Sequence, residues 1–100
     1  MAWKQDPSFE WDQAKSDENF TKRGFDFEYA CRIFDGDIIE WDDTRRDYGE
    51  RRVIAIGEIE EQIYVIVYTP REQVRRIISA RPASRRERNA YHKAFPRRDS

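Results

Sequence analysis

The sequence predicts an α+β fold, because helical patterns open the chain, three strand-like segments follow, and a further helix start closes it. The segments 52–59, 63–69 and 74–81 are rich in Ile, Val and Tyr, which favour strands. Short polar joints separate them, so we expect an antiparallel meander. The 100 residues are 38% hydrophobic, which suits one modest core and a single domain over residues 1–100.

The first helix is predicted from its two ends. Phe9-Glu10-Trp11 suggests a short edge strand, and Asp12 after it is a good N-cap for a helix that reaches Arg23. Gly24 then stops the helix. Ala14 and Phe20 are the apolar residues of this segment, so no wide buried stripe can hold it. We expect its exposed face to be available to a partner or a substrate.

A second, core-facing helix is predicted after Asp26. Apolar residues then recur at the spacing i, i+3, i+4 and i+7, at Phe27, Ala30, Cys31 and Phe34. Because Cys31 lies on this stripe, we interpret it as a buried, inert thiol.

The rest of the chain divides at turn residues. Asp35-Gly36-Asp37 ends the second helix, residues 38–41 are extended, and residues 42–50 form a polar loop. Reversals are expected at 60–62 and 70–73, and Pro82 closes the last strand. Ser84 and Glu87 have the spacing of a capping box, which predicts a helix to about Phe95. We expect residues 97–100 to be a frayed tail.

Composition restricts both location and chemistry. No apolar run approaches the length of a membrane span, and no signal pattern opens the chain, so we expect a cytoplasmic protein with no membrane partner. Cys31 is the single cysteine and His92 the single histidine. A disulfide is therefore impossible, and we expect no His/Cys metal site and no cofactor. His92 on the last helix is either a solvated residue or a titrating group.

Charge is divided unevenly along the chain. Residues 1–50 carry 7 Lys/Arg against 14 Asp/Glu, whereas residues 51–100 carry 12 against 6. Such a bias can neutralise phosphates of a nucleic acid. Two other interpretations stay open: the arginines form a solvated face, or they pair with the acidic half.

Strand alternation predicts how the arginines of segment 74–81 are oriented. Arg76 should share a face with Ile78 and Ala80, whereas Arg75 and Arg81 should lie on the opposite face. Arg76 then either forms a buried ion pair or binds phosphate. Arg81 can reach the helix start at Ser84, where unpaired N–H groups and the helix dipole favour an anion. Three further arginines stand nearby, at Arg85, Arg86 and Arg88.

Motifs along nearly the whole chain resemble the BrnT family of toxins. They are Phe9-Glu10-Trp11-Asp12, Lys15, Asn19, Lys22 with Gly24, Phe27-Glu28, Phe34-Asp35, Tyr48-Gly49-Glu50-Arg51, Ile56-Gly57, Val67-Tyr68-Thr69, Ile77-Ile78-Ser79-Ala80-Arg81, and Arg86-Glu87-Arg88 with Tyr91. The chain departs from the family where it has Arg23 in place of a common histidine, and where it has Arg71-Glu72 in place of an Arg-Gly turn.

The resemblance implies a fold similar to the RelE class: an antiparallel sheet, made of the three-strand meander plus N-terminal strands, packed with two N-terminal helices and one C-terminal helix. It also implies a ribonuclease toxin of a type II toxin–antitoxin system, neutralised by a BrnA-type antitoxin. Operator DNA would be bound only through the antitoxin complex. The alternative is a non-catalytic binding module that works only within that protein–DNA repressor complex.

Metal-free RNA cleavage needs a proton acceptor, a proton donor and cations for the phosphate. We therefore select as catalytic candidates Lys22, Tyr48, Glu50, Arg76, Arg81 and Glu87. The candidates for binding RNA phosphate are Arg23, Arg51, Arg85, Arg86 and Arg88. Structural roles compete for two of the acids, because Glu87 belongs to the capping box and Glu50 can pair with Arg51 or Arg52.

Overall fold

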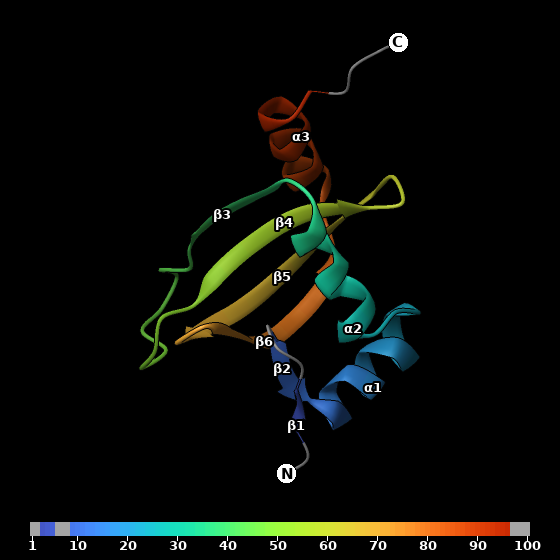
Figure 1. The fold of residues 1–100 in the computed structure, drawn as a ribbon. Coiled ribbons are helices and arrows are strands. Elements are labelled where there is room, and N and C mark those ends of the chain that lie inside the picture. The colour runs from blue at the N-terminus through green and yellow to red at the C-terminus, as the bar shows by residue number, and fades with distance from the viewer. Residues whose placement is uncertain (1–2, 6–8, 97–100) are drawn as a thin grey trace.

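The computed structural model describes residues 3–5 and 9–96, which form a mixed β-sheet with helices at both ends (Figure 1). The sheet has six strands in the order β1-β2-β6-β5-β4-β3. The elements are β1 (Trp3–Gln5), β2 (Phe9–Asp12), α1 (Gln13–Arg23), α2 (Phe27–Ala30), the 3-10 helix η1 (Cys31–Asp35), β3 (Ile38–Asp42), β4 (Val53–Ile59), β5 (Gln62–Arg71), β6 (Val74–Pro82) and α3 (Arg85–Ala94). None of the described helices is long and apolar enough to cross a membrane.

The predicted α+β class and the antiparallel meander of β4, β5 and β6 are confirmed. Glu60 and Glu61 join β4 to β5, and both have positive φ, 50° and 71°, which is typical of the type I′ turn of a tight hairpin. The predicted reversal into Val74 is confirmed, but it is shorter than the predicted 70–73, because β5 continues to Arg71. Pro70 is accommodated near the end of β5, where few ladder hydrogen bonds remain to be lost.

The N-terminal strand was expected at an edge, and this is wrong. β2 lies between β1, with which it pairs antiparallel, and β6, with which it pairs parallel. The sheet is therefore mixed and not purely antiparallel. The parallel pairing follows from the connection, since α1, α2 and four further elements intervene before the chain returns beside β2 as β6.

The predicted helix boundaries are confirmed by their caps. The Asp12 carboxylate accepts a hydrogen bond from the Ala14 N–H at 2.9 Å, and Gly24 ends α1 in the left-handed conformation with φ of 85°. Asp26 caps α2 by accepting from the Tyr29 N–H at 2.8 Å. The predicted core helix is only partly α-helical, because after Ala30 the chain continues as η1.

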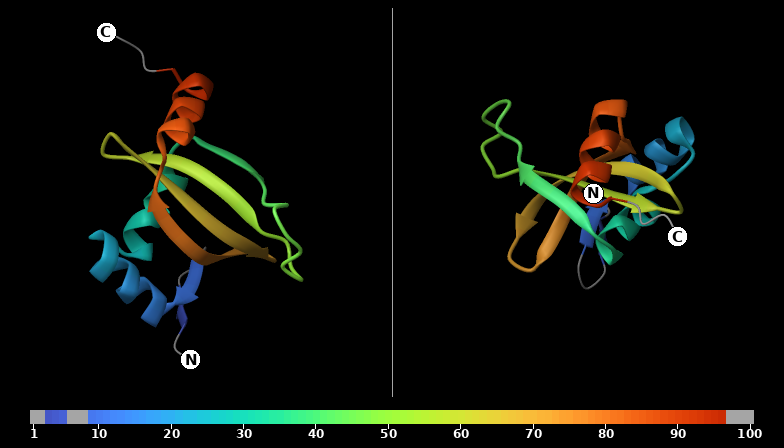
Figure 2. Two further views of the ribbon diagram at one scale, coloured as in Figure 1. Left: turned by 180° about the vertical axis from the view of Figure 1, so that it is seen from behind. Right: turned by 90° about the horizontal axis from the view of Figure 1, so that it is seen from above.

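Two hydrophobic cores lie on the two faces of the sheet. One includes Ile66, Tyr68 and Ile77 and is covered by Phe27 and Ile33 of α2 and η1. Cys31 is buried in this core, as predicted. The other includes Ile56, Ile63 and Val65 and is covered by Tyr91 of α3, whose hydroxyl donates to the Asp37 carbonyl at 2.8 Å. Figure 2 shows α3 and the α1–α2 pair at opposite ends of the sheet. The predicted tail, residues 97–100, lies outside the described residues.

Gly57 of β4 marks the closest approach between the sheet and η1. A Cβ atom built there would lie 2.6 Å from the Ile33 Cβ and 3.2 Å from the Ile33 carbonyl oxygen. Real Cβ contacts are longer than this, so any larger residue must push η1 away from the sheet. The absence of a side chain at Gly57 is therefore a packing requirement.

We predict that Gly57→Ala lowers the free energy of unfolding by about 1–3 kcal/mol, the usual cost of overpacking a core. For a chain of this size, each kcal/mol corresponds to a fall of roughly 4–8 °C in melting temperature. Gly36→Ala is the matched control, because a Cβ at Gly36 meets nothing within 4 Å. Thermal unfolding followed by circular dichroism measures both variants. Equal melting temperatures for the two variants would contradict this account of Gly57.

Candidate nucleic-acid interface

An irregularity in β6 places two of the predicted arginines on the same face of the sheet. Ser79 pairs with Val67, but Ile77 pairs with Tyr68, so Ile78 is a bulge without a partner on β5. Arg81 pairs with Val65, a residue of the core beneath α3. Arg76 pairs with Thr69, two residues along β5 from Val67 of the same core, and so faces the same side.

The predicted separation of Arg76 from Arg81 is therefore wrong, because the extra residue reverses the alternation at Ile78. Arg75 is the arginine that faces the other side of the sheet. Its guanidinium carbon lies 4.4 Å from the centre of the Phe34 ring and 5.5 Å from that of Tyr68, a cation–π arrangement. We call the face that carries Arg76 and Arg81 the α3 face.

The loop between β3 and β4 is organised by one buried carboxylate, that of Asp43. The side chain of Asp43 is 1% exposed. It accepts two hydrogen bonds at 2.8 Å from the Arg45 guanidinium and one at 3.0 Å from the Tyr48 hydroxyl. The hydrogen bond from Arg45 holds the pKa of Asp43 far below its usual range. Asp43 therefore stays ionised and fixes the positions of Arg45 and Tyr48.

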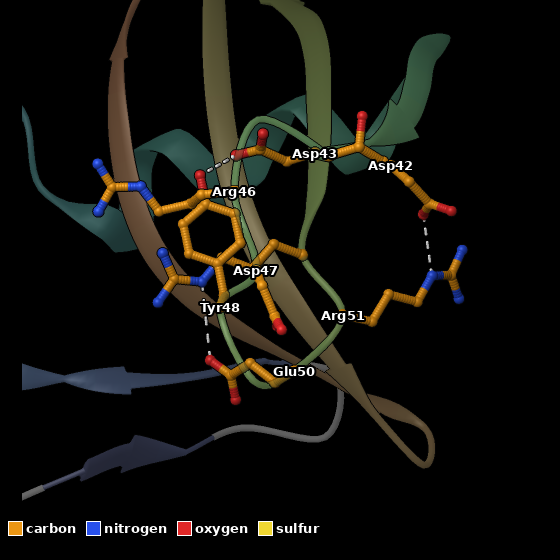
Figure 3. Close-up of a pocket in the computed structure, with 9 residues that line it drawn as sticks. Asp42, Asp43, Arg46, Asp47, Tyr48, Glu50 and Arg51 are labelled. Carbon is orange, nitrogen blue, oxygen red and sulfur yellow. Dashed lines mark hydrogen bonds and ion pairs between the residues drawn. The ribbon is translucent and has the colours of Figure 1, made fainter.

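Two further arginines lie near the ring of Tyr48. The guanidinium carbon of Arg52 lies 4.1 Å from the centre of the Tyr48 ring, and that of Arg46 lies 6.0 Å away. A hollow of about 390 Å³ opens within this loop. Figure 3 shows the Tyr48 hydroxyl directed at Asp43, while the Asp42–Arg51 pair points away from that contact. The loop thus presents Arg46 and Arg52 at one aromatic ring, while Arg45 is bound to Asp43.

Arg81 and Glu87 form a two-pronged ion pair at the start of α3. The two terminal nitrogens of Arg81 donate to the two carboxylate oxygens of Glu87 at 2.7 and 2.8 Å. Glu87 also accepts from the Ser84 N–H at 2.8 Å, and Ser84 accepts from the Glu87 N–H, so the predicted capping box is confirmed. Hydrogen bonding to Arg81 lowers the pKa of Glu87 to about 2. Glu87 is thus an ionised carboxylate at neutral pH.

The charge of Arg81 is stabilised chiefly by its partner Glu87. The pKa of Arg81 is raised, mainly by its hydrogen bond to Glu87, while the positive charge of Arg45 acts in the opposite direction. On the α3 face lie Arg76 and Arg81 of β6, and Arg81 is bound to Glu87 at the start of α3.

Further predicted residues lie either in the Asp43 loop or on α1. Glu50 lies 3.7 Å from Arg52 across an ion pair, and Arg51 donates to Asp42 at 2.9 Å. Lys22 is paired with Glu18 at 3.0 Å on α1. Lys22 and Arg23 line a separate hollow of about 340 Å³, beside Ile78 and Ser79 of β6.

The arginines of the first turns of α3 are exposed. Arg85, Arg86 and Arg88 point to solvent, and Arg88 donates to the Ala83 carbonyl at 3.0 Å. His92 lies against the ring of Tyr91, with 5.9 Å between the ring centres. No group of three or more His, Cys, Asp or Glu side chains within the described residues is placed to hold a metal ion.

Four residues of this site were not among the candidates selected from the sequence. Asp43, Arg45, Arg46 and Arg52 lie in or beside a polar loop that has no periodicity, and charged residues in such loops are usually solvated. A useful signal would have been the two arginine doublets, 45–46 and 51–52, on either side of an aromatic residue. Basic residues interleaved with an aromatic ring are typical of nucleic-acid contacts.

The Arg81–Glu87 pair predicts how stability depends on acidity. The pKa of Glu87 is lowered from 4.5 to about 2 on folding, so the pair stabilises the protein above pH 5 and is lost as the pH falls toward 2. Glu87→Gln should cost about 1–2 kcal/mol at pH 7, after allowance for partial exposure to solvent. The difference from the unmodified protein should shrink as the pH falls from 5 to 3. Urea unfolding across this range measures it, and a constant difference would contradict the assignment.

Comparison with known families supports the resemblance noted in the sequence. Residues 11–87 match the family model described as the ribonuclease toxin BrnT of type II toxin–antitoxin systems. A comparison with curated protein sequences finds no significant match. The matched range extends from β2 into the first turn of α3, and so contains the Asp43 loop and the Arg81–Glu87 pair. Because this range covers more than half of the chain, the protein belongs to the BrnT family of ribonuclease toxins.

Proposed function

We propose that the protein binds RNA and cleaves it at the Asp43 loop, without a metal ion, as the toxin of a type II toxin–antitoxin pair. One observation carries this proposal: arginines of the Asp43 loop gather at the ring of Tyr48, beside the carboxylate of Glu50. The guanidinium carbons of Arg52 and Arg46 lie 4.1 and 6.0 Å from the centre of that ring, and Glu50 lies 3.7 Å from Arg52. Guanidinium groups bind phosphate with two parallel hydrogen bonds, so such a cluster suits an RNA backbone.

The reaction we propose is attack of a ribose 2′-hydroxyl on the adjacent phosphorus. The 2′-oxygen forms a bond to phosphorus, the bond to the 5′-oxygen breaks, and the products are a 2′,3′-cyclic phosphate and a 5′-hydroxyl. A base takes the 2′ proton, an acid supplies a proton to the leaving 5′-oxygen, and cations stabilise the charge on the phosphate. Arg46 and Arg52 beside Tyr48 are the cations that we place at this phosphate.

We assign the proton acceptor to Glu50. Its carboxylate lies at the edge of the arginine cluster, 3.7 Å from Arg52. Glu87 is less suitable, because it is engaged by Arg81 and Ser84 and its pKa is lowered to about 2. We therefore propose that Arg81 and Glu87 hold the start of α3 beside the site. Tyr48, whose hydroxyl donates to Asp43, positions the arginines around its ring.

The remaining basic candidates are proposed to contact the RNA backbone away from the cleaved bond. Lys22 and Arg23 line their hollow beside β6, and Arg85, Arg86 and Arg88 follow the start of α3. The paired Arg51 belongs to this outer group. Arg76, which faces the same side as Arg81, is proposed to bind phosphate between the two regions.

We further propose that the chain acts as one domain with a RelE-like fold, in the cytoplasm, where its substrate is found. A BrnA-type antitoxin holds it inactive, and operator DNA is bound only through that complex. A type II toxin is defined by having a protein antitoxin, so the family supports the partner class.

We predict that the purified protein cleaves RNA in the presence of EDTA and that its expression alone slows bacterial growth. The arginine cluster supplies the positive charge that a metal ion would otherwise bring to the phosphate. Gel analysis of bulk RNA, with and without EDTA, provides the measurement. Loss of cleavage in EDTA that a divalent ion restores would refute metal independence. If the folded protein cleaves no RNA at all, the non-catalytic binding module becomes the better interpretation.

We predict that Arg46→Ala slows RNA cleavage on the order of 100-fold, by analogy with the removal of one transition-state donor. Arg46 forms no ion pair within the described residues, so the melting temperature should not change. Arg46→Lys should recover part of the rate, because a point charge cannot replace a two-pronged contact. Arg32→Ala is the control, an exposed arginine on η1 paired with Glu60. Equal rates for the Arg46 and Arg32 variants would remove Arg46 from the site.

A further inference from the structure

An aromatic hollow lies between α1 and α2, and Arg23 is the residue that it shares with the proposed RNA contacts. Its volume is about 440 Å³, and it is lined by Phe20, Phe25, Tyr29 and Tyr64, with Arg23, Gly24 and Asp26 at its border. Two large hydrophobic side chains of the described residues are exposed, and Phe20, at 59%, is more exposed than Trp41. Solvent exposure of an aromatic ring at the rim of a hollow is typical of a binding surface.

Three aromatic rings that contact one another form the floor of the hollow. Tyr64 meets Phe25 edge to face, with 5.0 Å between ring centres, and meets Tyr29 in the same way at 5.9 Å. The ring planes of these two pairs are inclined by 70° and 84°. The rings therefore do not form a flat platform on which nucleic-acid bases could stack. A site of this kind accepts an apolar side chain, which needs shape and not a flat surface.

α1 itself is weakly held by the rest of the protein. Ser16 is its one buried residue among eleven. Ser16 accepts from the Phe27 N–H at 2.9 Å, and Asn19 donates to the Phe25 carbonyl at 2.9 Å, so α1 is tied to the next segment by polar contacts. A helix with so little buried apolar surface is available to a partner.

The two flanks of α1 differ in character. On one side is the aromatic hollow, and on the other is the hollow lined by Lys15, Lys22 and Arg23, where Glu18 is the one carboxylate of the lining. Arg23 borders both hollows. A ligand that lies across α1 therefore contacts the aromatic hollow on one flank and the positively charged hollow on the other.

We infer that α1 and the aromatic hollow form the docking surface for a segment of the protein antitoxin that carries an apolar anchor next to acidic residues. The identity of this partner rests on the proposed function, while the surface itself does not depend on that function. A second copy of the chain is disfavoured, because two copies of the Lys15, Lys22 and Arg23 flank would repel each other. The acidic part of the segment would cover Lys22 and Arg23 and so compete with RNA.

The test is the affinity between the full-length toxin and the product of the neighbouring reading frame that suppresses its growth defect. Calorimetry on Phe20→Glu should show binding at least about 30-fold weaker, the effect of losing an aromatic hot spot. Phe20→Ala should give a smaller loss. RNA cleavage by Phe20→Ala, measured without antitoxin, should equal that of the unmodified protein. Trp41→Glu is the matched control, because Trp41 on β3 is 44% exposed and should bind the antitoxin normally.

The outcomes separate the surface from the function. Unchanged antitoxin affinity in a folded Phe20→Glu variant overturns the docking surface, as does an equal loss in Trp41→Glu. A Phe20→Glu variant that binds antitoxin normally but cleaves RNA slowly assigns the hollow to RNA and also overturns it. If the unmodified protein binds antitoxin through Phe20 but cleaves no RNA, the docking surface stands and the proposed ribonuclease function fails.

Discussion

The bulge at Ile78 is the constraint on which the arrangement of charge in this protein depends. Strand residues alternate between faces, so one extra residue changes the face of every side chain beyond it. Before the bulge, Ile77 faces the core beneath α2, and after it Ala80 faces the same core. The core thus keeps its apolar residues in spite of the irregular spacing. As a consequence, Arg76 and Arg81 share the opposite face.

The Asp43 loop depends on a different principle, the cost of burying a charge. A carboxylate that is 1% exposed must be compensated by donors, and Asp43 has the Arg45 guanidinium, the Arg45 N–H and the Tyr48 hydroxyl. The backbone of Asp43 is also fixed, because its N–H donates to the Arg52 carbonyl at 2.8 Å. A long polar loop is thereby held in one conformation without a hydrophobic core of its own. That order is what allows its arginines to act as a preorganised group.

The sequence was most informative where a signal is local. Asp12, Gly24, Asp26 and the Ser84–Glu87 pair each occupy the predicted cap, because a cap depends on residues within one turn. Nonlocal features were missed: the parallel pairing of β2 with β6 and the bulge at Ile78. Each depends on contacts between segments more than thirty residues apart or on a register that alternation alone does not specify.

The uneven charge of the two halves now has a structural interpretation. If the acidic half neutralised the basic half, the arginines of β6 and α3 would be paired with carboxylates from residues 1–50. Three ion pairs of the described residues cross this boundary without involving α3: Arg32–Glu60, Arg51–Asp42 and Arg52–Glu50. Arg81 is paired within the basic half, with Glu87. The positive charge of Arg85, Arg86 and Arg88 is therefore not cancelled by the acidic half. Positive charge that is left uncompensated on an exposed helix attracts a polyanion from a distance.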